Sequence, residues 1–294
     1  MAMRTTQSNQ RLLLISAILF TIAVLPTAAD ELKTKRAELG QWIMTYYLHP
    51  EPEQFVERVR SMSKVGMLHD PSPTARPDAN VMFLGKIMAA NPTKISEWLD
   101  ALSSLPVEEK VVVNRAAWYS GTAEANAWLQ EHGEVALAKS PRPTLLAERQ
   151  VMNMQPYHLD ELWEWFFATG EAKPVGRIVS LFSLAHEPPR KDTSDLLAPP
   201  KKPIAGSASK ADRQRPKNGQ ISKMSDESLY RLRIKNYRLL KPAMWSCTSL
   251  AIQQNRVLEI LKNMESDHYH TGIKAWLGQI IKIAEDVRAK KTKR

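Results

Sequence analysis

Hydrophobic residues recur at steps of three and four from residue 30 to residue 186, with polar residues between them. Leu39, Trp42, Ile43 and Tyr46 belong to one such stripe. This spacing places apolar side chains on one face of an α-helix, whereas a half-buried strand would show strict alternation. No convincing alternating run interrupts the pattern. The sequence therefore predicts an all-α body over residues 30–186.

Proline and glycine divide this body into segments of helical length. Pro106 and Pro156 open apolar stripes, as expected near a first helical turn, and Gly121 and Gly170 follow stripes, as expected of C-terminal caps. Both glycines come shortly after an aromatic pair and directly after a small hydroxyl residue. We therefore expect stacked antiparallel helix pairs, arranged either as an irregular domain or as a degenerate, solenoid-like repeat.

Residues 224–294 are expected to form a C-terminal helical segment that packs on the body. Basic and apolar residues alternate at first in Leu229–Lys241, which fits a basic helix or a short edge strand, and we favour the helix because its surroundings are helical. The last helix, with an apolar stripe from Ile273 to Val287, is expected to fray into a basic tail, residues 288–294. About seventy residues bury too little apolar surface for an independent domain, so docking is expected.

Three strings in the helical part resemble a group of uncharacterised, exported, all-helical bacterial proteins. These are Leu159–Gly170, the Ala117–Gly121 turn and the pair Trp245-Ser246. The resemblance covers most of the chain after residue 29, outside the central Pro/Lys-rich stretch. It implies a helical, exported protein, and it implies neither an activity nor site residues.

Residues 1–29 show the order of parts expected of a secretory signal peptide. Arg4 and Arg11 precede the apolar run Leu12–Leu25, which a proline and small residues follow. Such a run would give about 21 Å of helix, shorter than the hydrocarbon core of about 30 Å, so cleavage is favoured over a membrane anchor. We expect cleavage at Ala29–Asp30 and a mature chain, without a transmembrane segment, in the periplasm or outside the cell.

Positive charge is concentrated in particular segments of the chain. The whole sequence carries 41 Lys and Arg against 31 Asp and Glu, yet residues 30–186 hold 16 basic and 20 acidic side chains. Residues 187–223 hold nine basic and four acidic side chains, and residues 288–294 hold five basic side chains and no acidic one. Because residues 187–223 are also rich in proline and poor in large apolar residues, they predict a disordered basic linker.

The basic segment after this linker is a candidate contact for an anionic surface. Its cationic side chains are Arg231, Arg233, Lys235, Arg238 and Lys241. Lipid headgroups, an acidic polysaccharide or an acidic protein would attract them. Nucleic acid is not the expected partner of an exported chain. The same charges also fit a solvated helix face without a partner, and both interpretations stay open.

Few residues suggest chemistry at a site. His268, His270 and Asp267 could contribute to a metal site only if a turn gathered them, because residues at i and i+2 on a helix point apart. The alternative is a polar loop between helices. The sequence lacks the patterns of phosphate loops, nucleophile elbows and zinc proteases, and no cofactor is expected. Cys247, in an apolar string, is interpreted as a buried small hydrophobe.

Aromatic residues offer a second kind of candidate site. Trp163, Trp165, Tyr230 and Tyr237 could line a groove that stacks a peptide or a glycan. For the tryptophans, which adjoin two phenylalanines, the alternative is a place in the core. The expected function is a non-catalytic interaction protein of the cell envelope that binds a protein or peptide and orients on an anionic surface. A helical hydrolase of envelope polymers and a secreted, host-directed effector are the alternatives.

Overall fold

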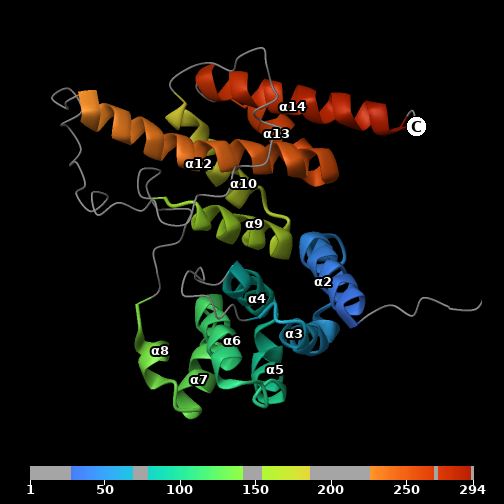
Figure 1. Cartoon of the computed structure of the whole chain (residues 1–294). Coiled ribbons are helices and arrows are strands. Elements are labelled where there is room, and N and C mark those ends of the chain that lie inside the picture. Colours follow the sequence, from blue (N-terminus) through green and yellow to red (C-terminus); the bar gives the residue numbers. More distant parts are fainter. Residues whose placement is uncertain (1–27, 69–78, 142–153, 186–225, 268–270, 293–294) are drawn as a thin grey trace, which may run out of the picture.

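The computed structural model describes residues 28–68, 79–141, 154–185, 226–267 and 271–292, and these residues form helices and no strand (Figure 1). The prediction of an all-α fold is confirmed. The predicted linker, residues 187–223, and almost all of the predicted signal peptide lie outside the described residues. Helix α2 (Ala28–Thr45) contains both residues of the expected cleavage bond.

The body contains α-helices and short 3-10 helices that stack on one another (Figure 1). After α2 they follow in the order η1 (Tyr46–Leu48), η2 (Pro52–Gln54), α3 (Phe55–Lys64), α4 (Ala79–Ala90), η3 (Pro92–Lys94), α5 (Ile95–Ala101), α6 (Val107–Ser120), α7 (Ala123–Glu131), α8 (Val135–Lys139), α9 (Tyr157–Thr169), α10 (Ala172–Val179) and η5 (Ser180–Leu184).

Helix α4 lies at the centre of the body because it is apolar on almost every side. Phe83, Leu84, Ile87 and Met88 are fully buried, and the helix packs between α6 and α9. A Cβ at Gly85 would lie 2.9 Å from the carbonyl oxygen of Ala116, so α4 and α6 approach closely there. The glycine therefore permits the tight packing of α4 against α6.

The two turns that look alike in the sequence are alike in the structure. Gly121 ends α6 with φ of 78°, and Gly170 ends α9 with φ of 68°, both in the left-handed region. Glycine adopts this conformation without the penalty that a Cβ would bring. Each turn leads directly into the next helix, as predicted.

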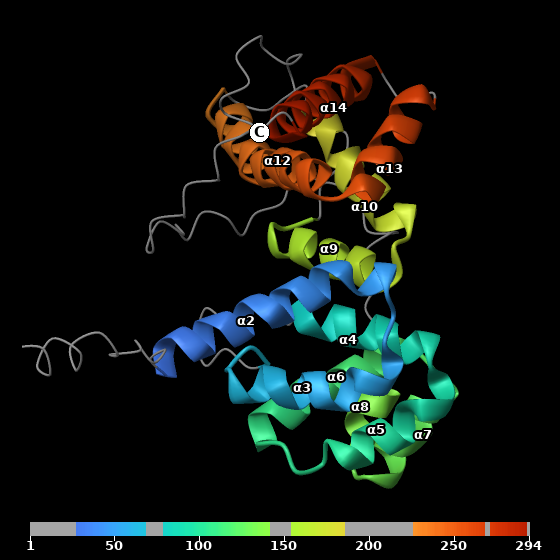
Figure 2. The ribbon, with the colours of Figure 1, turned by 90° about the vertical axis from the view of Figure 1, so that its right-hand side faces the viewer.

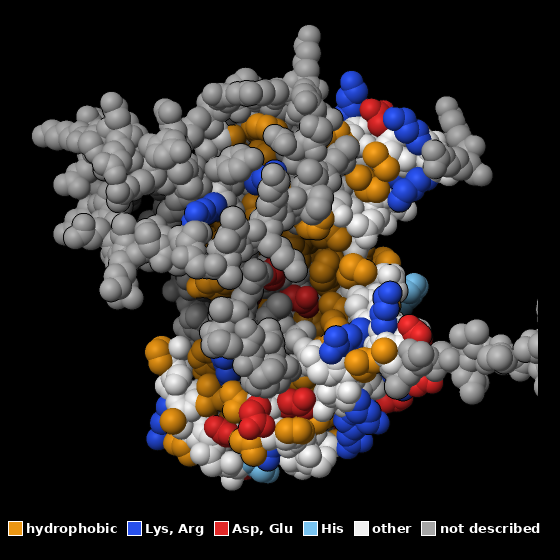
Figure 3. Space-filling model, in the orientation of Figure 1, with side chains coloured by type: hydrophobic (Ala, Val, Ile, Leu, Met, Phe, Trp, Pro, Cys, Tyr) orange, Lys and Arg blue, Asp and Glu red, His pale blue; other side chains and the backbone are white. Residues whose placement is uncertain are grey.

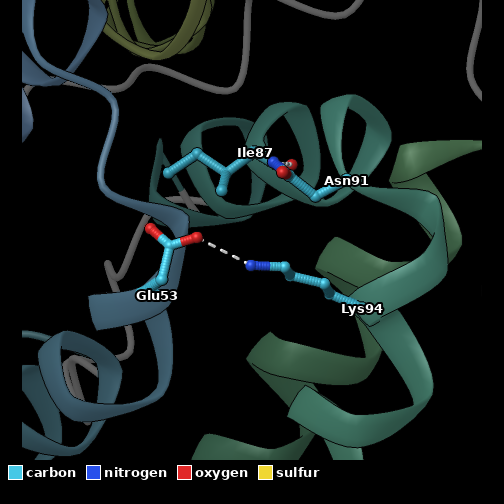
Figure 4. Close-up of polar contacts among 4 residues, drawn as sticks. All are labelled: Glu53, Ile87, Asn91 and Lys94. Carbon is cyan, nitrogen blue, oxygen red and sulfur yellow. Dashed lines mark hydrogen bonds and ion pairs between the residues drawn. The ribbon is translucent and has the colours of Figure 1, made fainter.

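An ion pair connects η3 to η2, since Lys94 Nζ lies 2.8 Å from Glu53 Oε1 (Figure 4).

Three C-terminal helices form a layer on one side of the body, and we call residues 226–292 the basic layer (Figures 1 and 2). The layer consists of α12 (Asp226–Gln253), α13 (Asn255–Ser266) and α14 (Thr271–Thr292). It packs on α10 and η5, where Leu181 and Phe182 are fully buried. Leu229–Lys241 is part of α12, which is one helix that continues through Pro242.

The end of the basic layer differs from the sequence expectation. Residues 288–294 were expected to leave the helix as a frayed tail, but α14 continues to Thr292. Arg288 Nε donates to the carbonyl oxygen of Ile252 at 3.1 Å, and its Nη1 donates to Asn255 Oδ1. These bonds join the last turns of α14 to the junction between α12 and α13, which explains why the helix persists.

A small polar contact connects the body to the basic layer. The Tyr47 hydroxyl donates to Gln254 Oε1 at 3.2 Å, and Gln254 Nε2 donates to the carbonyl oxygen of Met44 at 3.2 Å. Tyr47 in turn packs against the turn at Gly170, where a Cβ would lie 2.8 Å from Tyr47 Cδ2. Elements far apart in the sequence therefore meet at one joint.

None of the described helices is long and apolar enough to cross a membrane.

Candidate interaction surfaces

Helix α12 contains all five predicted cationic contacts and both predicted tyrosines. These are Arg231, Arg233, Lys235, Arg238, Lys241, Tyr230 and Tyr237. The side chain of Arg238 is exposed and that of Lys241 is half-buried, while the other five side chains lie outside those that the structure describes. The structure therefore brings the seven residues onto one continuous helix and places two of their side chains.

Trp163 and Trp165 on α9 are buried, with exposed fractions of 6% and 4%. The Trp163 ring packs edge-on against Phe166 at a centroid distance of 5.9 Å and stacks on Phe167 at 6.2 Å. These contacts are those of core residues, so the two indole rings are not open to a peptide or a glycan. Of the two interpretations of these tryptophans, the place in the core is the one that the burial supports.

Two lysines flank the ring of Trp165. Lys86 Nζ, from α4, lies 3.9 Å from the ring centroid, and Lys173 Nζ, from α10, lies 5.8 Å from it. The pKa of the Lys86 ammonium is lowered, mainly by burial. The negative charge of Glu171 raises this pKa, and the positive charge of Lys173 lowers it. The ring faces attract both cations, so α4, α9 and α10 share a cation–π cluster that the sequence did not suggest.

Glu164 on α9 has a deeply buried carboxyl group whose pKa is strongly shifted. Burial, reinforced by the negative charge of Asp160 one turn earlier, raises the pKa of the Glu164 carboxyl from 4.5 to about 8. Its Oε2 is shielded from solvent and has no hydrogen-bond partner among the described residues. Near neutral pH this group is therefore protonated to a large extent and is not a fixed negative charge.

The metal candidates are not assembled into a site that the structure describes. Asp267 is exposed at the end of α13, and His268 and His270 lie outside the described residues. Within the described ranges, no three His, Cys, Asp or Glu side chains are grouped so that they could hold a metal ion. Cys247 is fully buried in α12, and burial raises the pKa of its thiol, in keeping with its interpretation as a small core residue.

A further polar cluster, absent from the sequence prediction, joins α5 to α7. The Trp128 indole Nε1 donates to Asp100 Oδ1 at 2.8 Å, and His132 Nε2 lies 3.6 Å from the same oxygen. His132 stacks on Trp128 at a centroid distance of 3.9 Å, and its Nδ1 donates to the Trp128 carbonyl oxygen at 2.8 Å. Since the Trp128, Asp100 and His132 side chains all bond within the cluster, its geometry favours a structural role.

Two parts of the fold carry an excess of opposite charge. Residues 92–140, from η3 to α8, hold four basic and seven acidic side chains, and we call them the acidic lobe. The basic layer, residues 226–292, holds twelve basic and seven acidic side chains. The body helices α2, α4 and α9 lie between these two parts (Figures 1 and 2). The folded chain therefore has an electrostatic polarity along its long direction.

The acidic lobe also exposes large apolar side chains. Val107 and Val111, one turn apart on α6, are 67% and 50% exposed, and Val135 on α8 is 38% exposed. Figure 3 shows hydrophobic and acidic side chains next to one another on this part of the surface. The same view shows a recess between the body and the basic layer, with hydrophobic side chains along its walls. Contiguous apolar surface, as on the walls of this recess, is typical of interaction sites.

Comparison with known proteins gives no family for this chain. No protein-family model, no curated protein and no solved structure matches it. Its function is therefore inferred from its own residues. The helical spacing of Val107 and Val111 indicates that both fall on one face of α6, but the sequence does not indicate that this face is exposed.

Proposed function

We propose that the protein is an exported, non-catalytic interaction protein of the cell envelope. The observation that supports this best is the separation of charge between the basic layer and the acidic lobe. An anionic surface would attract the basic layer and repel the acidic lobe, so the molecule would bind in one orientation. The acidic lobe, with its exposed valines, would then face away from that surface and remain open to a protein partner.

The basic layer offers cations that suit a charged surface. Arg238 is exposed on α12, and Lys290 and Lys291 are exposed near the end of α14. Lys262 is paired with Glu285 at 2.6 Å, and Arg288 bonds to Ile252 and Asn255, so these two contribute less. Each basic residue close to an anionic membrane contributes about 1 kcal/mol of binding free energy. These contributions add, so several such residues together increase the affinity for the membrane by orders of magnitude.

The test is co-sedimentation of residues 30–294 with vesicles of phosphatidylcholine, with or without phosphatidylglycerol. We expect binding to the anionic vesicles that weakens as the salt concentration rises. The triple change Arg231→Glu, Arg233→Glu and Lys235→Glu should weaken binding by about tenfold or more, since it reverses three charges.

The matched control reverses positive charges on the acidic lobe, with Lys110→Glu and Lys139→Glu. These residues lie at the other end of the molecule, so this variant should bind anionic vesicles nearly as well as the wild type. Equal binding to both kinds of vesicle, or equal binding by the triple variant and the wild type, would reject the anionic-surface part of the proposal. Mass spectrometry of the exported chain tests the expected N-terminus, Asp30.

A further inference from the structure

Three nitrogen donors without an acceptor meet at the ring of Trp165, where α4, α9 and α10 come together. The Trp165 side chain is only 4% exposed, and its Nε1 has no hydrogen-bond partner among the described residues. Lys86 Nζ lies 3.9 Å from the centroid of this ring, and Lys173 Nζ lies 5.8 Å from it. Within the described part of the chain, neither ammonium group forms a hydrogen bond or an ion pair.

This arrangement leaves the donors unsatisfied. A buried N–H group has lost its hydrogen bonds to water, and without an acceptor nothing replaces them. The positive charge of Lys173 lowers the pKa of Lys86, so the two ammonium groups are close enough to repel each other. The Trp165 ring attracts both cations, but it cannot accept from its own N–H. What the three donors share is the need for a negatively charged acceptor.

The carboxyl groups near the ring do not supply this acceptor. The negative charge of Glu171 raises the pKa of Lys86, but Glu171 is exposed and forms no ion pair with either lysine among the described residues. Glu164 precedes Trp165 in α9, yet the charges that shift its pKa do not include either lysine. The two ammonium groups therefore keep a positive charge that a ligand can neutralise.

The site is open to solvent on the side of α10. The turn at Gly170 leads the chain from α9 into α10, and it places Lys173 in the exposed first turn of that helix. Lys86, on α4, is half-buried, and Trp165 is buried. A ligand from solvent therefore reaches Lys173 first and Lys86 next. Nε1 of Trp165 is shielded, so the flexible Lys86 side chain over the ring has to turn before an oxygen can approach this N–H.

These donors fit a phosphate group better than a carboxylate. A phosphate monoester carries nearly two negative charges at neutral pH, which two ammonium groups balance, whereas a carboxylate carries one. Lysine binds phosphate as a point charge, while flat carboxylates are matched by the fork of arginine. We infer that α4, α9 and α10 form a phosphate-binding site, in which Lys86 and Lys173 contact the phosphate oxygens and Trp165 Nε1 donates to one of them. The site lies in the body and is independent of the anionic surface proposed for the basic layer.

Isothermal titration calorimetry of residues 30–294 with sodium phosphate tests the site. We expect one phosphate per chain and an affinity that falls as the salt concentration rises. Lys86→Met and Lys173→Met each keep a long side chain and remove its charge, and each should weaken binding by about tenfold or more. The matched control Lys64→Met removes an exposed charge at the end of α3 and should bind phosphate as the wild type does.

Nuclear magnetic resonance tests whether the ligand lies at the ring. The chain contains eight Trp, and the indole N–H signal of Trp165 is the one that disappears in Trp165→Phe. Phosphate should move this signal downfield, as a new acceptor does, and leave the other indole signals nearly unchanged. Circular dichroism checks that each variant keeps its helices.

Three results would refute the inference. One is the absence of saturable binding at millimolar phosphate, and another is phosphate binding that leaves the Trp165 signal in place. The third is equal phosphate binding by the wild type and by the folded variants Lys86→Met and Lys173→Met.

The source of the phosphate group is identified by comparing ligands. Inorganic phosphate, glycerol 3-phosphate and vesicles of phosphatidylcholine with phosphatidic acid all offer the same dianion. Binding of inorganic phosphate alone would identify the free ion, and binding of glycerol 3-phosphate as well would identify a soluble monoester. Vesicle binding that an excess of inorganic phosphate displaces, and that Lys86→Met loses, would identify a lipid headgroup.

The same variants separate this inference from the proposed function. The triple variant with Arg231, Arg233 and Lys235 changed to Glu should bind inorganic phosphate as the wild type does. Lys86→Met should bind phosphatidylglycerol vesicles as the wild type does. Each of the two proposals can therefore fail without the other.

Discussion

Glu164 shows how one side chain can acquire properties that its sequence neighbourhood does not indicate. A carboxylate on a helix is usually solvated, yet here burial beside Asp160 raises the pKa of Glu164 to about 8. The sequence places Glu164 four residues after Asp160, which predicts a shared helix face. It cannot predict how deeply that face is covered, because the cover comes from elements distant in the chain.

The raised pKa gives a stability prediction with a definite sign. The native state holds the Glu164 proton up to about pH 8, whereas the unfolded chain releases it near 4.5, so stability falls as pH rises between these values. Glu164→Gln should remove this part of the fall, which amounts to about 3 kcal/mol of unfolding free energy between about pH 5 and about pH 8. Urea denaturation at about pH 5 and about pH 8 measures the difference.

An exposed carboxylate provides the control for this substitution. Glu57→Gln on α3 changes a solvent-facing side chain and should alter the unfolding free energy by less than about 0.5 kcal/mol. If Glu164→Gln and the wild type lost stability equally between the two pH values, the Glu164 carboxyl would not be protonated in the native state.

At the level of the element, the sequence was most informative about helices and their ends. Apolar residues at steps of three and four identified the helices of the body, and glycine after a hydroxyl residue identified the caps of α6 and α9. The end of α14 was misjudged, because five basic residues without an acidic one suggest a solvated tail. The bonds from Arg288 to Ile252 and Asn255, 36 and 33 residues earlier, keep that end helical.

The cap between α9 and α10 also lends itself to a test. Gly170→Ala puts a Cβ on a residue with φ of 68° and brings it to 2.8 Å from the Tyr47 ring. Backbone strain of about 1 kcal/mol and a clash at the joint with Gln254 should then add together, for a total loss of about 2 to 3 kcal/mol. Urea denaturation measures the loss in unfolding free energy.

Gly133 allows the backbone strain to be measured separately from the clash with Tyr47. Its φ of 86° is also in the left-handed region, but a Cβ there meets nothing within 4 Å. Gly133→Ala should therefore cost only the strain, about 1 kcal/mol. Equal losses for the two alanine variants would mean that the contact between Gly170 and Tyr47 does not constrain the joint.

On the scale of the whole molecule, the sequence indicated where charge is concentrated but not how it is arranged in space. It placed the positive excess in segments outside a near-neutral body. Within that body, the fold places the acidic segment from η3 to α8 at the end opposite the basic layer. This separation follows from which helices stack together, and local spacing along the chain carries no information about such stacking.

The packing of the basic layer on the body predicts that the two unfold together. Phe182 is fully buried in η5, against which α12 and α14 pack. Phe182→Ala should remove about 3 to 4 kcal/mol of stability by leaving a cavity between the two parts. Hydrogen exchange should show α4, α9 and α12 losing protection by a similar free energy.

An exposed residue again gives the comparison. Leu48→Ala, at an exposed position in η1, should change the unfolding free energy by less than about 0.5 kcal/mol. Loss of protection in α12 to α14 alone, with α4 and α9 unchanged, would show that the basic layer unfolds as a unit of its own.

The burial of Cys247 makes the native chain convenient for labelling. Maleimides react with the thiolate, and here the single thiol of the chain is both enclosed and held in its protonated form. A cysteine introduced at an exposed position such as Lys290 becomes the one reactive thiol without removal of the native one. Copies labelled there and copies labelled on the acidic lobe would report energy transfer only when two chains come together.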